Sequence, residues 1–357
     1  MANSFSGLTA FVNEQRFANK FWLDSLLKND ALPYLQQYGM VASGVKENTF
    51  TLQQLSATVG IETGVGCSDD FDNGNDTTIT QRSITLTKGR IKDSICPHDD
   101  WETYYTALRM PAGQHYRDLG PWQGPLMGAI AEKVGKRLGY NIWQGEQSGD
   151  TWTFSGLYEQ LIAANMGTYD AGSNPTGGIV GTGTIDGTNN TTTGAYYVLQ
   201  NLITAGLTSQ SVAGKDFASD VHSGNVHFVL NPYTAELVRQ SYLAAHGTAM
   251  PEIAIGLAGL QNNVQGGFRF PGWGVPMIIQ NFVPDNFVAM IRNGNAVIAF
   301  DALSDLTSME MWQADDHQTL RWLMAFKMGV GWNELTGNAI KYFGATTYQR
   351  PGPWHVM

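Results

Sequence analysis

The sequence has little charge and no excess of basic residues. Only 15% of its 357 residues are charged, against about 25% in an average protein. Interface cores are poor in charge and rich in aromatic side chains. With 10 Trp, 14 Tyr and 16 Phe, the composition is typical either of a protein that buries much surface against partners or of a weakly charged globular protein. The formal net charge of −10 argues against direct readout of nucleic acid, since phosphate-binding proteins are usually basic.

Cysteines, a signal peptide and long apolar runs are also scarce or missing. The two cysteines, Cys67 and Cys96, match neither a disulfide framework nor a zinc pattern, which favours a reducing cytoplasm. The N-terminus has no basic region followed by an apolar run, so no signal peptide is predicted. No stretch reaches the roughly 18 apolar residues of a membrane span. A chain of this length is expected to form about two domains and to fold without disulfides or metal.

Motifs for cofactors and metals are incomplete. Gly64–Gly66 and Gly181–Gly183 begin like dinucleotide loops but lack the third glycine. Asp70, Asp72 and Asp76 offer oxygen ligands, yet the Gly and Glu that an EF-hand loop needs are absent from its sixth and twelfth positions. This acidic run is therefore interpreted as a solvated or subunit-facing loop tip. We expect no cofactor and no metal.

One cluster leaves an enzymatic alternative open. His98 and Asp99 have the residue types of a general base and the group that orients it. Trp101 and an apparent helix follow directly, so the cluster more often represents a turn before a helix. There is no Walker loop, no His-Glu-x-x-His and no nucleophile elbow. We expect no catalytic residue, while a soluble hydrolase with a scattered site stays as the less favoured alternative.

The first half of the chain predicts a helix, a hairpin and a second helix. Apolar residues spaced four apart predict an amphipathic helix over Glu14–Lys28. Strands are predicted at Thr49–Gln53 and Thr78–Thr87, on either side of the acidic segment Glu62–Asp76. Two strands joined by such a tip form a long projecting hairpin, which is marginally stable alone and needs a supporting surface. A long helix is then predicted over 121–139, with an apolar residue every fourth position.

The middle of the chain alternates in type. Phe154–Ala164 and Ala195–Ala205 are predicted helices, the second ended by Gly206 as a C-terminal cap. The Gly-, Thr- and Asn-rich region 167–194 between them is predicted to be a surface loop or an irregular insertion. A predicted strand, Val226–Leu230, leads into a helix that runs from Pro232 to about Ala245, with Asn231 as its N-cap.

The last part of the chain predicts strands. Asn293-Gly294 is typical of a tight hairpin turn and separates two apolar runs, 287–291 and 296–300. Residues 320–329 alternate with period two, which predicts a half-buried strand. With strands at 307–314 and 339–343, an antiparallel sheet is expected to close the chain.

This order of elements resembles the Hong Kong ninety-seven type fold of tailed-bacteriophage major capsid proteins. The resemblance covers nearly the whole chain and depends on arrangement, since no single piece is diagnostic. Four segments are similar to parts of that fold: the strand leaving its extended hairpin, its spine helix, its axial strand and helix, and its returning segment. They are Ile84–Ile95, Trp122–Gly139, Val226–Leu237 and Gly274–Ile279 followed by Val283–Asn286.

The resemblance implies an α+β fold with four parts. These are an N-terminal arm and helix at 1–37, an E-loop hairpin at 45–90, a peripheral domain made of 91–152 and 302–357 with the spine helix 121–139, and an axial domain at 153–301. It implies that the E-loop tip contacts an adjacent subunit, with basic residues such as Arg82, Lys88 and Arg90 available on the same hairpin. The interface residues so assigned are Glu62, Asp69, Asp70, Asp72, Asp76, Arg82 and Lys88.

The function implied by the resemblance is structural. Pentamers and hexamers of the chain would form an icosahedral virion shell that encloses double-stranded DNA without sequence-specific binding. Synthesis in the host cytoplasm, no membrane contact, and scaffold, portal and decoration proteins as further partners belong to the same expectation. An encapsulin-type compartment, which shares the fold but holds a protein cargo, is the main alternative.

Overall fold

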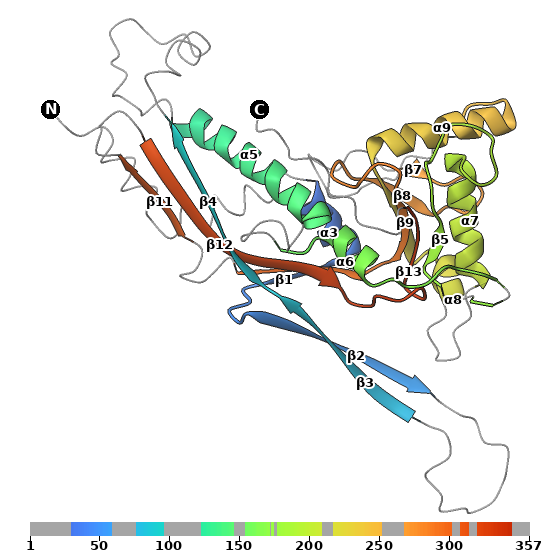
Figure 1. Cartoon of the computed structure of the whole chain (residues 1–357), viewed down its shortest axis with the longest axis horizontal. Helices are drawn as coiled ribbons and strands as arrows, with labels where there is room; N and C mark the ends of the chain where they lie inside the picture. Colours follow the sequence, from blue (N-terminus) through green and yellow to red (C-terminus); the bar gives the residue numbers. More distant parts are fainter. Residues whose placement is uncertain are drawn as a thin grey trace, which may run out of the picture.

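The computed structural model describes residues 30–58, 76–95, 123–145, 154–171, 173–174, 177–208, 217–251, 268–301, 308–313 and 320–344. These residues form a five-stranded sheet, a six-stranded sheet and a separate two-stranded hairpin, together with helices that cover the two larger sheets (Figure 1). The predicted α+β class is confirmed. The predicted helix Glu14–Lys28 lies outside the described residues.

The five-stranded sheet is organised around one long strand, β12 (Leu320–Trp332). On one edge of β12, β10 (Ala296–Asp301) and β11 (Ser308–Gln313) pair with it antiparallel, one after the other. On the opposite edge it pairs with β4 (Thr87–Ile95), and β1 (Met40–Ser43) adds to β10 in parallel. The predicted period-two strand is confirmed and extends to Trp332.

One face of this sheet packs against α5 (Gln123–Gln144). The repeating apolar residues of the helix, such as Val134 and Leu138, share a buried core with Phe326 and Met328 of β12. The predicted long helix is therefore confirmed and extends past its predicted end at 139. Two shorter helices, α3 (Ala31–Tyr38) and α6 (Leu157–Ala163), join the same core.

The central strands of the six-stranded sheet are buried on both faces. Its strands lie in the order β5-β13-β9-β6-β8-β7. Alternate residues face different cores: Phe228 and Met290 pack against α7 (Ala195–Thr208) and its neighbouring helices, whereas Val229 and Ile291 join the core shared with α5. Its strands are β5 (Ile179–Gly181), β6 (Val226–Leu230), β7 (Phe268–Arg269), β8 (Pro276–Ile279), β9 (Val288–Arg292) and β13 (Ile340–Phe343).

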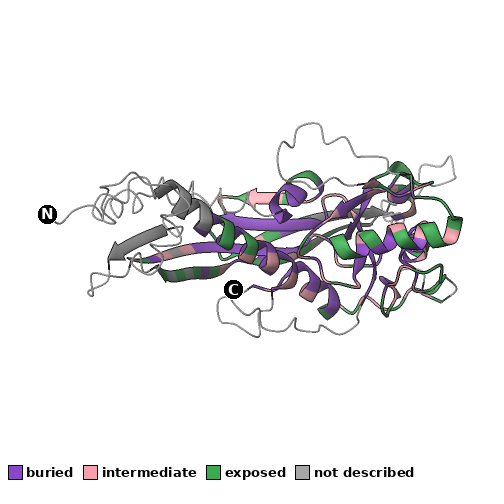
Figure 2. Ribbon diagram, turned by 90° about the horizontal axis from the view of Figure 1, so that it is seen from above, coloured by how far each residue is buried: buried purple, intermediate pink, exposed green. Residues whose placement is uncertain are grey.

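Three helices cover the far face of the six-stranded sheet: α7 (Ala195–Thr208), α8 (Phe217–Ser223) and α9 (Pro232–His246). Figure 2 shows the sheets largely buried and exposed positions on the outer sides of the helices. The predicted cap of α9 is confirmed, because the Asn231 side chain accepts a hydrogen bond of 2.7 Å from the backbone N–H of Thr234.

The prediction of a hairpin at Asn293-Gly294 is wrong. Strand β9 before the turn pairs with β6 and β13, while β10 after it pairs with β1 and β12. Of the two turn residues only Gly294 has a positive φ, of 78°, whereas the tight hairpin turn needs both. The turn carries the chain from one sheet to the other.

The expected closing sheet is also only partly correct. β11 pairs with β12 as predicted, but β13 belongs to the six-stranded sheet. The chain therefore passes from the six-stranded to the five-stranded sheet before residue 301, between β9 and β10. It passes back after residue 301, between β12 and β13. The division into a peripheral and an axial domain at that residue stays a prediction.

Two local predictions in the middle of the chain need correction. Gly206 is not a C-terminal cap, because α7 continues through it to Thr208. A Cβ at this position would lie 2.6 Å from Met290 Cε and 3.0 Å from Val221 Cγ2, so Gly206 permits close packing. The region 167–194 is not surface loop throughout, since it contains β5 and the buried side chain of Ile185.

Candidate assembly interface

The hairpin projects away from the body of the molecule (Figure 1). Its strands, β2 (Thr49–Thr58) and β3 (Asp76–Thr85), pair antiparallel over their whole length and form a sheet of their own. At about 3.3 Å per residue, these ten-residue strands reach roughly 33 Å. The two strands predicted on either side of the acidic segment thus form a projecting hairpin.

The base of the hairpin is fixed to the five-stranded sheet. Leu52 and Ile84 form a small buried cluster with Val297 of β10. Two glycines of β12 allow this approach: a Cβ on Gly329 would lie 2.4 Å from the carbonyl oxygen of Thr85, and one on Gly331 would lie 2.8 Å from Ile84 Cγ1. The hairpin is therefore held firmly at one end.

A buried lysine fixes the chain that enters the hairpin. The side chain of Lys327 is fully buried, and its Nζ donates hydrogen bonds to the backbone carbonyls of Lys46, at 2.7 Å, and of Glu47. A buried ammonium needs such partners because leaving it unsatisfied is costly. The segment before β2 is thereby tied to the middle of β12.

Beyond its base the hairpin exposes apolar surface. Ile79, six positions from the end of β3, is 63% exposed. An isolated two-stranded hairpin is at best marginally stable in water. Ile79 is consequently a side chain of the hairpin that gains from being covered by another surface.

The structure separates the residues predicted for the hairpin tip. Glu62, Asp69, Asp70 and Asp72 lie outside the described residues, and Asp76 is the first residue of β3. Arg82 lies near the base, opposite Leu52, and burial lowers the pKa of its guanidinium. Lys88 is not on the hairpin but on β4, opposite Lys327 of β12. Neither basic residue is therefore at the tip.

A row of basic side chains lies on the face of the five-stranded sheet that is turned away from α5. Lys88, Arg90 and Lys92 alternate along β4 and are exposed, whereas Gly89 contacts Phe326 on the α5 side. The exposed Arg321 of β12 pairs in register with Ser94, on the same face as this row. Sequence reasoning singled out only Lys88 and Arg90 and placed them on the hairpin. The alternation of basic residues at 88, 90 and 92 was the available signal.

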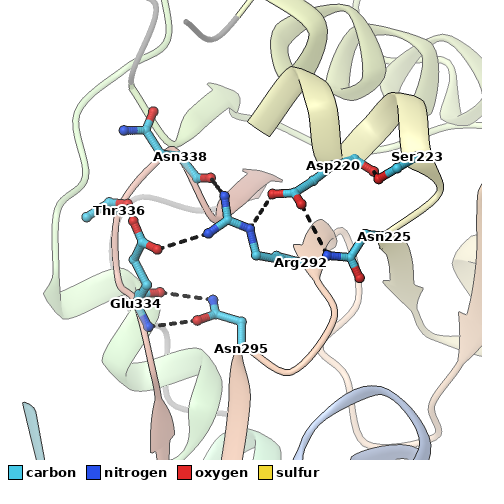
Figure 3. A network of polar contacts seen from close by, with 8 residues as sticks. All are labelled: Asp220, Ser223, Asn225, Arg292, Asn295, Glu334, Thr336 and Asn338. Carbon is cyan, nitrogen blue, oxygen red and sulfur yellow. Dashed lines mark hydrogen bonds and ion pairs between the residues drawn. The ribbon is translucent and has the colours of Figure 1, made fainter. Parts of the chain in front are cut away.

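The segments that connect the two sheets, the turn after β9 and the chain after β12, meet in a polar junction (Figure 3). Arg292, at the end of β9, forms ion pairs with Asp220 of α8 and with Glu334, the latter at 3.1 Å. Its remaining nitrogen donates to the carbonyl oxygen of Asn338 at 3.0 Å. The Asn295 side chain donates to the carbonyl of Glu334 at 2.9 Å and accepts from its N–H at 2.7 Å. The turn after β9 and the segment after β12 are thus clamped together.

A buried histidine extends this junction towards α3. His227 of β6 contacts Tyr34 Oη at 3.0 Å and Asn293 Oδ1 at 2.7 Å through its two ring nitrogens. Burial lowers the pKa of His227 to about 4, so the ring is neutral at physiological pH. Together with the Arg292 contacts, it ties the turn between the two sheets to α3 and β6.

The described part of the chain contains neither a metal-binding cluster nor a membrane-spanning helix. There, no His, Cys, Asp or Glu side chains form a group of three that could hold a metal ion. None of the described helices is long and apolar enough to cross a membrane. His98 and Asp99 lie outside the described residues.

Comparison with known proteins finds similarity only among solved structures. No protein-family model and no curated protein matches the chain. The capsid of Myoviridae phage XM1 is 13% identical, with a TM-score of 0.49 over 87% of this chain and 91% of that one. The capsid of an empty GTA particle is 17% identical, with a TM-score of 0.48 over 87% and 94%. An encapsulin of Synechococcus elongatus PCC 7942 is 12% identical, with a TM-score of 0.46 over 91% of both chains.

Proposed function

We propose that this chain is a major capsid protein that assembles as pentamers and hexamers into an icosahedral shell enclosing double-stranded DNA. The projecting hairpin is the observation that carries the proposal. It extends roughly 33 Å at about 3.3 Å per residue, is anchored at its base, projects from the body of the molecule, and exposes Ile79. A protein that acted alone would gain little from such an element.

The hairpin suits head-to-tail contacts between copies. One copy contributes the hairpin and its neighbour contributes a different surface, so the contact is heterologous and closes into a ring when the rotation between copies allows. In this proposal the acidic tip residues Glu62, Asp69, Asp70, Asp72 and Asp76 contact the adjacent subunit. The buried base of the hairpin, with Leu52 and Ile84 against Val297, attaches it to the five-stranded sheet, which favours the regular contacts that assembly requires.

The proposed role is structural and not enzymatic, and the proposed location is the virion. The net charge of −10 suits a wall that encloses DNA without gripping its phosphates tightly. Portal, scaffold and decoration proteins are the further partners of such a shell.

Electron microscopy of the purified chain after size-exclusion chromatography tests the proposal. We expect closed shells or capsomer rings. A stable monomer of 39.0 kDa at all concentrations from about 1 to 100 µM, a range that spans the affinities of weak to moderate complexes, would contradict it. Nuclease treatment and analysis of the particle contents then separate a DNA-filled head from an encapsulin-type compartment that holds a protein.

A further inference from the structure

The hairpin and the strand that follows it carry opposite charges. Residues 48–81 contain five acidic and no basic residues: Glu62, Asp69, Asp70, Asp72 and Asp76. Residues 82–92 contain four basic and no acidic residues: Arg82, Lys88, Arg90 and Lys92. The charge changes sign near the base of the hairpin, where β3 ends and β4 begins. The chain thus presents an acidic projection and a basic surface as separate regions.

The basic surface has a regular geometry. Lys88, Arg90 and Lys92 occupy alternate positions on β4, so they lie on one face and about 6.6 Å apart, twice the rise per residue of a strand. Arg321 of the neighbouring β12 lies on the same face, opposite Ser94. We name these four residues the basic row. No ion pair joins any of them to a carboxylate among the described salt bridges.

The acidic segment of one copy cannot reach its own basic row. From Asp76 to Lys88 the chain runs through β3 and β4, which continue in one direction in Figure 1, a path of roughly 40 Å at about 3.3 Å per residue. Asp69 is seven residues from Asp76 and extends at most about 24 Å from it. Glu62 is four residues from Thr58, which pairs with Asp76, and extends at most about 14 Å. A contact between these regions therefore requires two copies.

We infer that the basic row of β4 and β12 is the docking surface for the acidic segment 62–76 of a neighbouring copy. This inference rests on the proposed function and specifies which surface receives the hairpin. Opposite charges across a contact chiefly set specificity, register and association rate. The basic row would thus select the direction of the hairpin in each ring, while apolar residues such as Ile79 supply buried area.

A second polyanion that fits a basic row is nucleic acid. The overall charge of −10 disfavours it, because phosphate-binding surfaces are usually found on basic proteins. The chain itself supplies a complementary acidic segment with no basic residue in it, so a second copy is the occupant favoured by the sequence. Binding of DNA by the basic row, in place of the acidic segment, would contradict the inference.

The first experiment is zero-length carbodiimide cross-linking of particles assembled from an equal mixture of ¹⁴N- and ¹⁵N-labelled full chains. Carbodiimide joins carboxylates directly to lysines that touch them. We expect links between the segment 62–76 and Lys88 or Lys92, about half of them between chains of different isotope, as random pairing of two copies in equal amounts requires. Links from the segment only to other lysines, such as Lys133 on α5, would overturn the inference, as would links confined to single chains.

The second experiment is a charge exchange. Two double variants reverse one side of the contact each: Arg90→Glu with Lys92→Glu, and Asp69→Lys with Asp70→Lys. Each is expected to raise the concentration needed for assembly at least about tenfold in 0.15 M salt, since several ion pairs are replaced by like-charge contacts. Combining all four changes should restore assembly to within about threefold of the wild type. The matched control is Lys133→Glu with Lys136→Glu, which reverses two exposed cations on α5 and should change assembly less than about twofold, in the range of exposed ion pairs.

Salt provides a readout that a folding defect would not reproduce. The Debye length falls from about 8 Å at 0.15 M to about 3 Å at 1 M salt, so the difference between the wild type and either two-site variant should shrink at 1 M. Two-site variants that assemble like the wild type would overturn the inference. So would an Arg90→Glu/Lys92→Glu variant that forms normal shells but binds less DNA. A wild type that never assembles would instead contradict the proposed function.

Discussion

The six-stranded sheet and the hairpin β2–β3 differ in what covers them. The central strands of the sheet are buried on both faces within one subunit, by α7 to α9 on one side and by the core shared with α5 on the other. The hairpin is buried at its base, where Leu52 and Ile84 meet Val297, and exposes Ile79 further out. The five-stranded sheet is intermediate, since α5 covers one face while the basic row is exposed on the other.

This difference in burial separates the free energy of subunit folding from the free energy of assembly. Side chains in the six-stranded sheet stabilise the subunit itself, because their apolar surface is removed from water when one chain folds. An exposed hairpin side chain such as Ile79 contributes little until another surface covers it. Substitutions in the two regions should therefore affect different measurements, subunit unfolding in one and assembly in the other.

The largest effect on subunit stability is expected from Phe228→Ala. Phe228 is fully buried in β6, with its ring centroid 5.9 Å from that of Phe270. The change should lower the free energy of unfolding by about 4 kcal/mol, because it removes buried area and leaves a cavity. Urea unfolding of the unassembled subunit measures it. Tyr233→Ala, on the 60% exposed side chain of Tyr233 in α9, is the control and should stay within about 0.5 kcal/mol.

The next effect is expected at the junction between the two sheets. Arg292→Met leaves the carboxylates of Asp220 and Glu334 without their shared cation and should cost about 3 kcal/mol of unfolding free energy. Arg239→Met is the matched control, because the Arg239–Glu236 pair is exposed and such pairs contribute less than about 1 kcal/mol. Equal losses in the two variants would show that the junction is not a stabilising clamp.

A smaller effect is expected from the protonation of His227. Burial lowers its pKa from 6.5 to about 4, so below pH 6.5 the unfolded chain binds a proton that the folded chain does not. Stability from this residue therefore falls as the pH falls, by about 2 kcal/mol between pH 6.5 and pH 5. His227→Gln should remove this part of the pH dependence. Unfolding measured at several pH values in both proteins tests it, and parallel curves would contradict it.

The smallest effect on subunit stability is expected on the outer hairpin. Ile79→Ser replaces a side chain that is 63% exposed and should change the unfolding free energy by less than about 0.5 kcal/mol. Assembly, measured by sedimentation, should nevertheless weaken, because the apolar contact with the neighbouring copy is lost. Leu52→Ala at the buried base provides the contrast, with an expected loss of about 2 kcal/mol in the subunit. Normal assembly of Ile79→Ser would remove the outer hairpin from the proposed interface.

The amino-acid sequence by itself determined the elements whose causes are local. The apolar residues on one side of α5, the period-two alternation of β12 and the Asn231 cap of α9 each depend on residues a few positions apart, and all three were predicted. The strands of the hairpin were predicted for the same reason, although their acidic tip lies outside the described residues.

Only the tertiary structure decided which strands pair and which surfaces stay open. Asn293-Gly294 satisfies a local hairpin pattern, yet β9 and β10 enter different sheets because each finds its partners in distant strands. Gly206 meets the pattern of a cap but is retained within α7 against Met290. Lys88 lies next to the hairpin in sequence, whereas its register with Lys327 places it in the five-stranded sheet, where its side chain is exposed. Strand pairing depends on burial between distant segments, which short-range spacing does not encode.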